Sequence, residues 1–236
     1  MTPTPPAQAG RPENPPLPED FFRRTSLVLA QALLGAELVH RTPDGEAAGI
    51  IVEVEAYCGP VDRAAHSYGG RRTARTEVMY EPGGCAYVYQ IYGMHFCFNV
   101  VAAGRDEPQA VLVRALEPRH GLELMAQRRG ITLTDADRDW IRAREGAPPW
   151  KAAPTRPSAS LRALTAGPAR LCQALAIRRH QNGLPLTRGP LVIRRGFGPP
   201  PPEAVAVGPR INVDYAGVWA KEPLRFWIDG NPFVSR

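Results

Sequence analysis

Residues 49–57 read GIIVEVEAY, and from residue 52 onward apolar and polar side chains alternate. Alternate residues of a β-strand point to opposite faces, so this period of two is typical of a strand with one buried face. The two faces differ in chemistry: one holds Val52, Val54 and Ala56, and the other holds Glu53, Glu55 and Tyr57. The stretch therefore predicts a strand that carries carboxylates on one face.

Three further strands are predicted nearby. Residues 86–92 (AYVYQIY) and 95–101 (HFCFNVV) are separated by Gly93-Met94, a pair that suits a tight type II′ hairpin turn. Residues 110–116 (AVLVRAL) are apolar except for Arg114. A guanidinium in such a strand needs a carboxylate partner, and a structural ion pair accounts for it as well as a catalytic role does.

The rest of the chain predicts helices, loops and short strands. Apolar residues recur at helical spacing over 21–38, a second helix runs from 117 to about 129, and 163–177 form a third. Residues 59–79 predict a long surface loop with a turn at 62–66, and the C-terminal third predicts short strands that include 210–217. Without internal repeats or a break in composition, the chain predicts one α+β domain.

Composition narrows the class of protein. With 44% hydrophobic and 22% charged residues in 236, the chain has a globular composition, which excludes collagen, coiled coil and general disorder. Residues 1–18 hold seven prolines and predict a disordered tail, which leaves 19–236 as the folded domain. Without a long apolar run or a signal-peptide pattern, we expect a cytoplasmic protein that does not enter a membrane.

Charge and cysteines limit the partners. The net charge of +6 favours phosphate-bearing partners but is shared by many proteins that bind no nucleic acid. Four cysteines without a C-x-x-C pair indicate neither a zinc ribbon nor an iron–sulfur cluster, and we expect reduced thiols. We therefore expect neither a metal nor another cofactor.

The predicted strands bring chemical groups together. Glu55 and Tyr57 point the same way, and the turn at 62–66 can bring His66 over them. Aromatic and polar residues of the neighbouring strands add to this set: Tyr87, Tyr89, Asn99 and Arg114. Such a site can hold a planar ligand between rings with a carboxylate beside it. Taken singly, each residue also has an ordinary structural explanation, as sheet packing or as wet surface.

Longer runs of sequence are more specific. EVEAYCGPVDRAAHSYGGRRTAR, YVYQIYGMHFCFNVV, AVLVRALEPRHG, LTAGPARLCQALAI and EPLRFWIDGNPFVSR occur in this order between residues 53 and 236. Over about residues 22–236 the chain resembles the alkyladenine (3-methyladenine or methylpurine) DNA glycosylase family. The resemblance implies a curved, mostly antiparallel sheet flanked by helices, with a protruding β-hairpin, as in the C-terminal domain of methionyl-tRNA formyltransferase.

The resemblance also implies roles at the site. Glu55 matches the general base, Arg114 matches the arginine that holds the nucleophilic water and its carboxylate, and the Ile211 carbonyl matches a further contact to that water. The base pocket is matched by four residues: Tyr57, His66, Tyr89 and Asn99. Tyr92 matches an aromatic wedge that enters the duplex. The matching DNA contacts are Arg71, Thr73, Arg75, Met94 and His95.

The implied activity is hydrolysis of the N-glycosidic bond of alkylated or deaminated purines flipped out of duplex DNA. Lys151 and Lys221 are the chain's only lysines and lie outside the matching pocket segments, so we expect a monofunctional enzyme without Schiff-base lyase chemistry. We expect a monomer that associates with the nucleoid by binding DNA. Two alternatives are a non-catalytic nucleic-acid-binding module of the same fold and, from residues 166–168 alone, a helix-hairpin-helix glycosylase.

Overall fold

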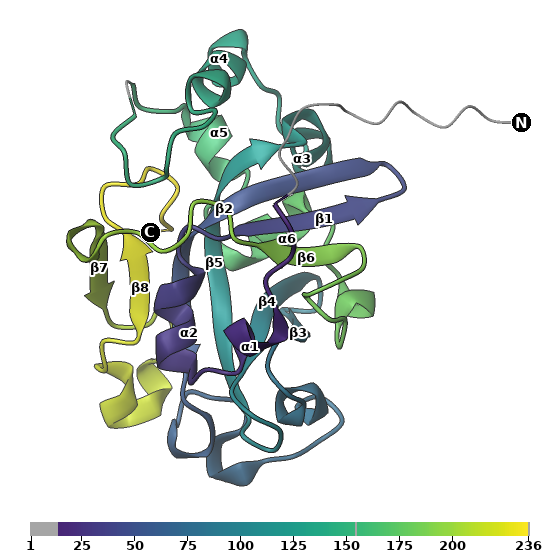
Figure 1. Ribbon diagram of the computed structural model, residues 1–236, viewed down its shortest axis with the longest axis vertical. Coiled ribbons are helices and arrows are strands. Elements are labelled where there is room, and N and C mark those ends of the chain that lie inside the picture. Colours follow the sequence, from purple (N-terminus) through teal and green to yellow (C-terminus); the bar gives the residue numbers. More distant parts are fainter. Residues whose placement is uncertain (1–13, 154, 236) are drawn as a thin grey trace, which may run out of the picture.

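The computed structural model describes residues 14–153 and 155–235, in which eight strands form one curled sheet (Figure 1). The main path runs β3-β4-β5-β2-β1-β6, and a β7–β8 hairpin joins β2 through β8. Every paired strand is antiparallel. The strands are β1 (Glu37–Thr42), β2 (Gly45–Tyr57), β3 (Ala86–Ile91), β4 (His95–Ala102), β5 (Gln109–His120), β6 (Leu191–Arg194), β7 (Val205–Gly208) and β8 (Arg225–Ile228).

Short helices surround this sheet (Figure 1). The α-helices are α1 (Glu19–Phe22), α2 (Ser26–Leu33), α3 (Leu122–Arg129), α4 (Asp135–Ala143), α5 (Ala159–Ala163) and α6 (Pro168–Ala174). The 3₁₀ segments are η1 (Gly59–Val61), η2 (Tyr68–Gly70), η3 (Glu77–Tyr80), η4 (Arg179–Gln181), η5 (Pro202–Ala204) and η6 (Asp214–Ala220). In residues 14–153 and 155–235, no helix has the length and apolar character that crossing a bilayer demands. These elements confirm the predicted α+β class.

The two faces of the sheet carry different side chains because each strand alternates. The main core takes Val52 and Val54 from β2 and Phe98 and Val100 from β4, together with apolar residues of α2 and α6. The intervening residues of β2 to β5 point to the other face, where Glu53, Glu55 and Arg114 meet. The predicted alternation of β2 is therefore confirmed.

The helix predicted over 21–38 is wrong in its extent. The chain instead forms α1, α2 and then β1, so Leu38 lies in a strand. Gly35 makes the turn between α2 and β1 with a φ of 81°, and a Cβ there would lie 2.0 Å from the Gly198 carbonyl oxygen. This close backbone approach leaves no room for a side chain and ends the helix.

Two other helix predictions differ in their bounds. The helix predicted over 163–177 forms only over 168–174, as α6, because Gly167, with a φ of 134°, precedes the Pro168 that opens α6, and Ala163 is the last residue of α5. The helix predicted from 117 begins only at Leu122, since β5 continues to His120. A longer strand keeps these residues hydrogen-bonded to β2.

The predicted tail ends earlier than Pro18. Residues 1–13 lie outside the described residues, but Pro16 forms a bridge with Arg194 and the Leu17 N–H donates to the Ile193 carbonyl at 2.8 Å. Leu17 is buried in the main core. The end of the expected tail is thus part of the fold.

Two local predictions in loops are also wrong. At the β3–β4 hairpin, Tyr92 and Gly93 have φ values of 49° and 72°, the pattern of a type I′ turn and not of type II′. Residues 210–217, expected in a short strand, instead lead into η6. Each of these two segments carries an exposed aromatic residue, Tyr92 in the first and Tyr215 in the second.

Candidate active site

One row of paired residues crosses four neighbouring strands. Glu55 of β2 lies opposite Leu112 of β5, Leu112 lies opposite Asn99 of β4, and Asn99 lies opposite Tyr87 of β3. Neighbouring strands are about 4.8 Å apart, so this register brings residues far apart in sequence onto one stretch of the sheet. The row joins the predicted carboxylate to the predicted aromatic residues.

Glu55 is fully buried, and three donors surround its carboxylate. Oε2 accepts a hydrogen bond from the Tyr57 hydroxyl at 2.9 Å, and Oε1 accepts one from the Ile211 N–H at 2.8 Å. The Arg114 guanidinium lies 3.1 Å from Oε1. Burial raises the pKa of Glu55, while Arg114 and both hydrogen bonds oppose the rise. The cost of burying this carboxylate is thus opposed by three donors that favour its charged form.

Arg114 is held between two carboxylates. Its Nε donates to Glu53 at 2.9 Å, and its third nitrogen, Nη2, donates to the Ser235 hydroxyl at 3.2 Å. Glu53 also accepts from the Ser235 N–H at 2.6 Å and from Arg225 at 3.2 Å. The predicted carboxylate partner of Arg114 is confirmed, and the network fixes the guanidinium plane beside Glu55.

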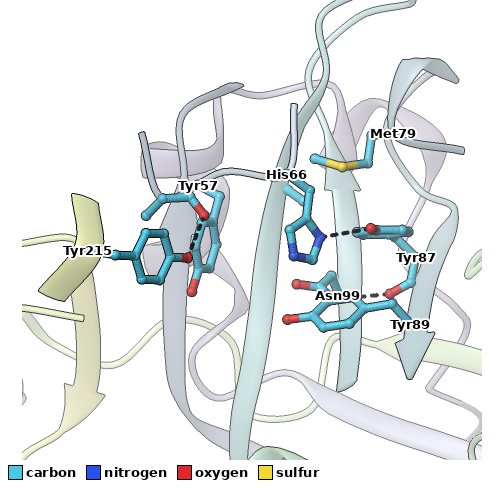
Figure 2. Close-up of a pocket in the computed structure, with 9 residues that line it drawn as sticks. Tyr57, His66, Met79, Tyr87, Tyr89, Asn99 and Tyr215 are labelled. Atoms are coloured by element: carbon cyan, nitrogen blue, oxygen red, sulfur yellow. Dashed lines mark hydrogen bonds between the residues drawn. The ribbon is translucent and has the colours of Figure 1, made fainter. Parts of the chain in front are cut away.

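An aromatic cavity of about 50 Å³ lies next to this network (Figure 2). Tyr57 and Tyr215 stand on one side, and His66, Tyr87 and Tyr89 stand on the other. This volume holds on the order of four waters. The cavity is lined by Tyr57, Ala64, His66, Met79, Tyr87, Tyr89, Asn99, Ala110 and Tyr215.

His66 is fixed by the aromatic residues of β3. Its Nδ1 lies 2.8 Å from the Tyr87 hydroxyl, and its ring centroid lies 4.6 Å from that of Tyr89. Asn99 is oriented by donation from its Nδ2 to the Tyr87 carbonyl at 3.1 Å. Burial, with Arg75 and Arg71 nearby, lowers the pKa of His66 to about 4. The imidazole is therefore neutral at physiological pH and does not repel a cationic ligand.

Two tyrosines have an arginine against one face. The Arg210 guanidinium lies 4.7 Å from the Tyr57 ring centroid, and that of Arg75 lies 5.1 Å from the Tyr89 centroid. Such contacts orient the rings through cation–π attraction. Arg75, predicted to grip a phosphate, thus also borders the cavity.

A wide groove is lined by two of the residues that contact Glu55. Arg114 and Ile211, which both contact the Glu55 carboxylate, line this groove of about 630 Å³ together with Asn212, Arg162 and Arg170. Tyr57, the third donor, lines the aromatic cavity. Glu55 itself lines neither space, and it is linked to the cavity through Tyr57 and to the basic groove through Arg114 and Ile211. The carbonyl contact expected of Ile211 stays a prediction, since its N–H is the group that reaches Glu55.

The hairpin tip presents three residues to solvent. Tyr92 is 86% exposed, and Met94 and His95 are exposed beside it. The positive φ of Tyr92 places its ring at the apex of the turn, away from the packed sheet. An aromatic side chain held so far out has no role in the core.

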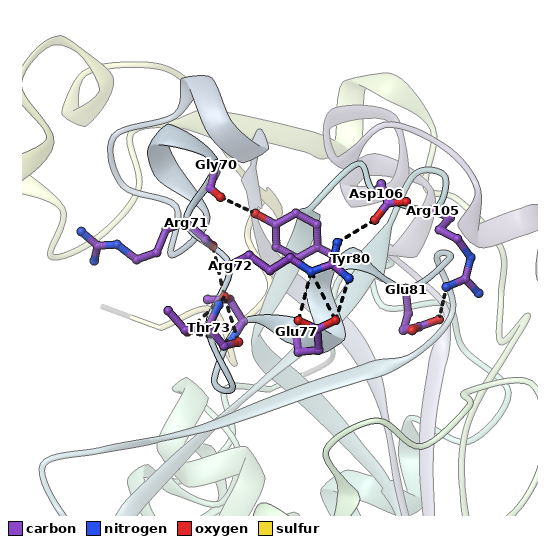
Figure 3. Close-up of polar contacts among 10 residues, drawn as sticks. Gly70, Arg71, Arg72, Thr73, Glu77, Tyr80, Glu81, Arg105 and Asp106 are labelled. Atoms are coloured by element: carbon purple, nitrogen blue, oxygen red, sulfur yellow. Dashed lines mark hydrogen bonds and ion pairs between the residues drawn. The ribbon is translucent and has the colours of Figure 1, made fainter.

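The arginines of the basic loop 71–75 differ in whether their charge is paired (Figure 3). Arg72 is bound by Glu77 at 2.6 Å and Asp106 at 2.9 Å, and it stacks 4.5 Å from the Tyr80 centroid. In the described residues Arg71 forms no ion pair, and its side chain is exposed (Figure 3). Thr73 is exposed as well, and its hydroxyl lies 3.2 Å from that of Thr76. Arg72 anchors the loop through its acidic partners, while the charge of Arg71 is available to bind an external anion.

Some residues of the site were absent from the sequence-based set. Asp62 and Arg210 form a fully buried ion pair, and Arg210 also donates to the Ala56 carbonyl at 3.0 Å. Tyr215 forms part of the cavity wall. These residues contact partners far away in the sequence, so no local sequence pattern predicts them. Only the alternation of β2 points to Glu53, which shares the face of Glu55.

Comparison with known proteins defines the class. The chain belongs to the methylpurine-DNA glycosylase family, whose family model matches residues 20–232. Named relatives follow the same pattern over nearly their whole length. A Bacillus licheniformis protein named "Putative 3-methyladenine DNA glycosylase" is 44% identical over 225 residues, which cover 95% of this chain and 99% of that protein. A Bacillus subtilis protein of the same name is 42% identical over 95% of this chain and 98% of its own.

Proposed function

We propose that this protein hydrolyses the N-glycosidic bond of alkylated or deaminated purines in duplex DNA and leaves an abasic site. The observation that carries the proposal is the contact set of Glu55, a buried carboxylate bonded to Tyr57 of the aromatic cavity and to Arg114 and Ile211 of a basic groove. The relatives are named for 3-methyladenine, and we extend the substrate class to 7-methylguanine, hypoxanthine and ethenoadenine. A non-catalytic DNA-binding module has no use for a buried, raised-pKa carboxyl at this position.

In this proposal the purine enters the cavity between Tyr57 and the rings of His66 and Tyr89. Alkylation at a ring nitrogen makes the purine cationic, so the tyrosine π faces and the neutral imidazole favour it over an undamaged base. The same positive charge makes the base a better leaving group, whereas neutral hypoxanthine must accept a proton or a hydrogen bond at the purine as the C–N bond breaks. Asn99 lines the cavity and disfavours the exocyclic amine of guanine there.

Glu55 serves the bond-breaking step. Departure of the base leaves oxocarbenium character on the sugar, which an ionised Glu55 stabilises. The carboxylate also takes the proton of a water that attacks the sugar carbon from the groove side, and Arg114 holds that water and Glu55 in place. The proton thus passes from the water to Glu55 as the new C–O bond forms.

DNA is held by groups outside the pocket. Tyr92 enters the duplex where the damaged nucleotide has left, and Met94 and His95 adjoin the minor groove. Arg71, Thr73 and Arg75 contact phosphates. Lys151 and Lys221 are exposed and line neither the cavity nor the groove, which supports a monofunctional enzyme. A nicked product formed without heat or alkali would contradict this.

Glu55→Gln tests the proposal. The amide keeps the shape of the carboxyl but accepts no proton from water, so single-turnover release of hypoxanthine or 3-methyladenine should fall at least about 100-fold. Binding to abasic-site duplex should stay nearly unchanged, which shows that the variant is folded. Glu53→Gln, on the same face of β2, should cause a smaller loss because Glu53 orients Arg114 and does not take the proton. Undiminished turnover by Glu55→Gln rejects the assignment.

A further inference from the structure

Tyr215 occupies the outer wall of the aromatic cavity. It lies in η6 and lines the same cavity as Tyr57 and His66, on the Tyr57 side (Figure 2). The residue is 69% exposed, and its hydroxyl donates to the Ala64 carbonyl at 3.4 Å, near the limit for a hydrogen bond. The side chain is therefore held only weakly at the cavity mouth.

The backbone of Tyr215 is fixed, in contrast to its ring. Val213 and Ala216, on either side of Tyr215, are buried in a small cluster with Ala64, against which Tyr57 packs. Gly217 follows with φ 63° and ψ −125°, a conformation that favours glycine and ends this buried stretch. A fixed backbone with a weakly held ring allows the ring to move without moving η6.

The residues that line the cavity are held with unequal firmness. Ala64 and Tyr57 belong to the buried cluster, and His66 is bound to Tyr87 at 2.8 Å. Tyr215 is the most exposed aromatic residue of the lining. The ring of Tyr215 is therefore the part of the wall that can yield at least cost.

We propose that Tyr215 is a specificity-determining residue that sorts flipped purines by size. The inference rests on the proposed function. The ring turns outward to admit a base and then packs on its exposed edge, so a purine enlarged by a fused ring displaces it further than hypoxanthine does. The contact to Ala64 sets the resting position of the ring, and the ring itself does the sorting.

Two substitutions with opposite expected effects test this. The readout is the ratio of kcat/KM for 1,N6-ethenoadenine to that for hypoxanthine, each placed singly in the same duplex. Tyr215→Ala removes the wall and should raise the ratio about tenfold, because the larger base no longer has to displace a ring and steric discrimination in a pocket is worth about 10–200-fold. Tyr215→Trp narrows the mouth and should lower the ratio. Tyr215→Phe should keep it within about twofold, because the ring remains.

The control is Val218→Ala, a change in the same 3₁₀ segment at a residue that is 75% exposed and does not line the cavity. It should leave the ratio unchanged. The inference is overturned if the wild-type protein excises either base but Ala and Trp at position 215 leave the ratio alone, or if Val218→Ala shifts it equally. Wild-type protein that releases neither base refutes the proposed function and this inference with it.

Discussion

Asp62→Ala should strongly destabilise the protein, because Asp62 holds its own loop, residues 58–64, and joins it to Arg210, which is distant in the sequence. Its carboxylate accepts hydrogen bonds from the Cys58 N–H at 3.0 Å, the Ala64 N–H at 2.9 Å and Arg210 Nη2 at 2.9 Å. Arg210 in turn donates to the Ala56 carbonyl and stacks on Tyr57. The side chains of Asp62 and Arg210 are both completely buried.

The expected loss follows from that burial. Removing one partner of a buried ion pair leaves an unpaired buried charge, which costs about 3–5 kcal/mol. A total stability of roughly 5–15 kcal/mol makes this a large fraction. At about 2–4 °C per kcal/mol for a chain of this size, Tm should fall by about 10 °C. Asp62→Asn keeps the shape and one acceptor oxygen, so its loss should be smaller.

The measurement is urea unfolding, in which the midpoint and the slope m separate a change in stability from a change in the unfolded state. Asp139→Ala is the matched control, because Asp139 pairs with Arg142 on the surface at side-chain exposures of 67% and 70%. It should change stability by less than ~0.5 kcal/mol. A loss of under about 1 kcal/mol for Asp62→Ala, with m unchanged, would refute the reasoning from burial.

Three other predictions concern activity and DNA binding. Because burial raises the pKa of Glu55 and the base must be ionised, single-turnover excision should climb as pH rises through that pKa and then level off; a profile that stays flat from acidic to neutral pH contradicts this. In salt titrations, Arg71→Ala should lower the slope of log affinity against log salt by about one, whereas Arg72→Ala, already neutralised by acidic partners, should keep it. Tyr92→Ala should weaken binding to damaged duplex more than to undamaged duplex, and equal losses argue against a wedge.

Local patterns in the sequence predicted the strands well and the helices less well. Alternation placed Glu53 and Glu55 on one face of β2, and the lone Arg114 in an apolar strand predicted the ion pair that the fold contains. The helix expected through Leu38 is wrong because apolar spacing does not reveal where the chain turns. That turn is set by Gly35 against Gly198, a contact between segments far apart in sequence.

The sequence by itself determined which residues share a face of each strand, because side-chain direction in a strand depends only on local backbone geometry. The motifs between residues 53 and 236 also indicated the family to which the chain belongs. Only the tertiary structure decided which strands are neighbours, and hence that Glu55 and Tyr87 lie in one row. Only the tertiary structure joined Asp62 to Arg210 and placed Tyr215 on the cavity wall. Such contacts depend on sheet register and on loop closure over more than 100 residues, and a local sequence pattern contains no information about either.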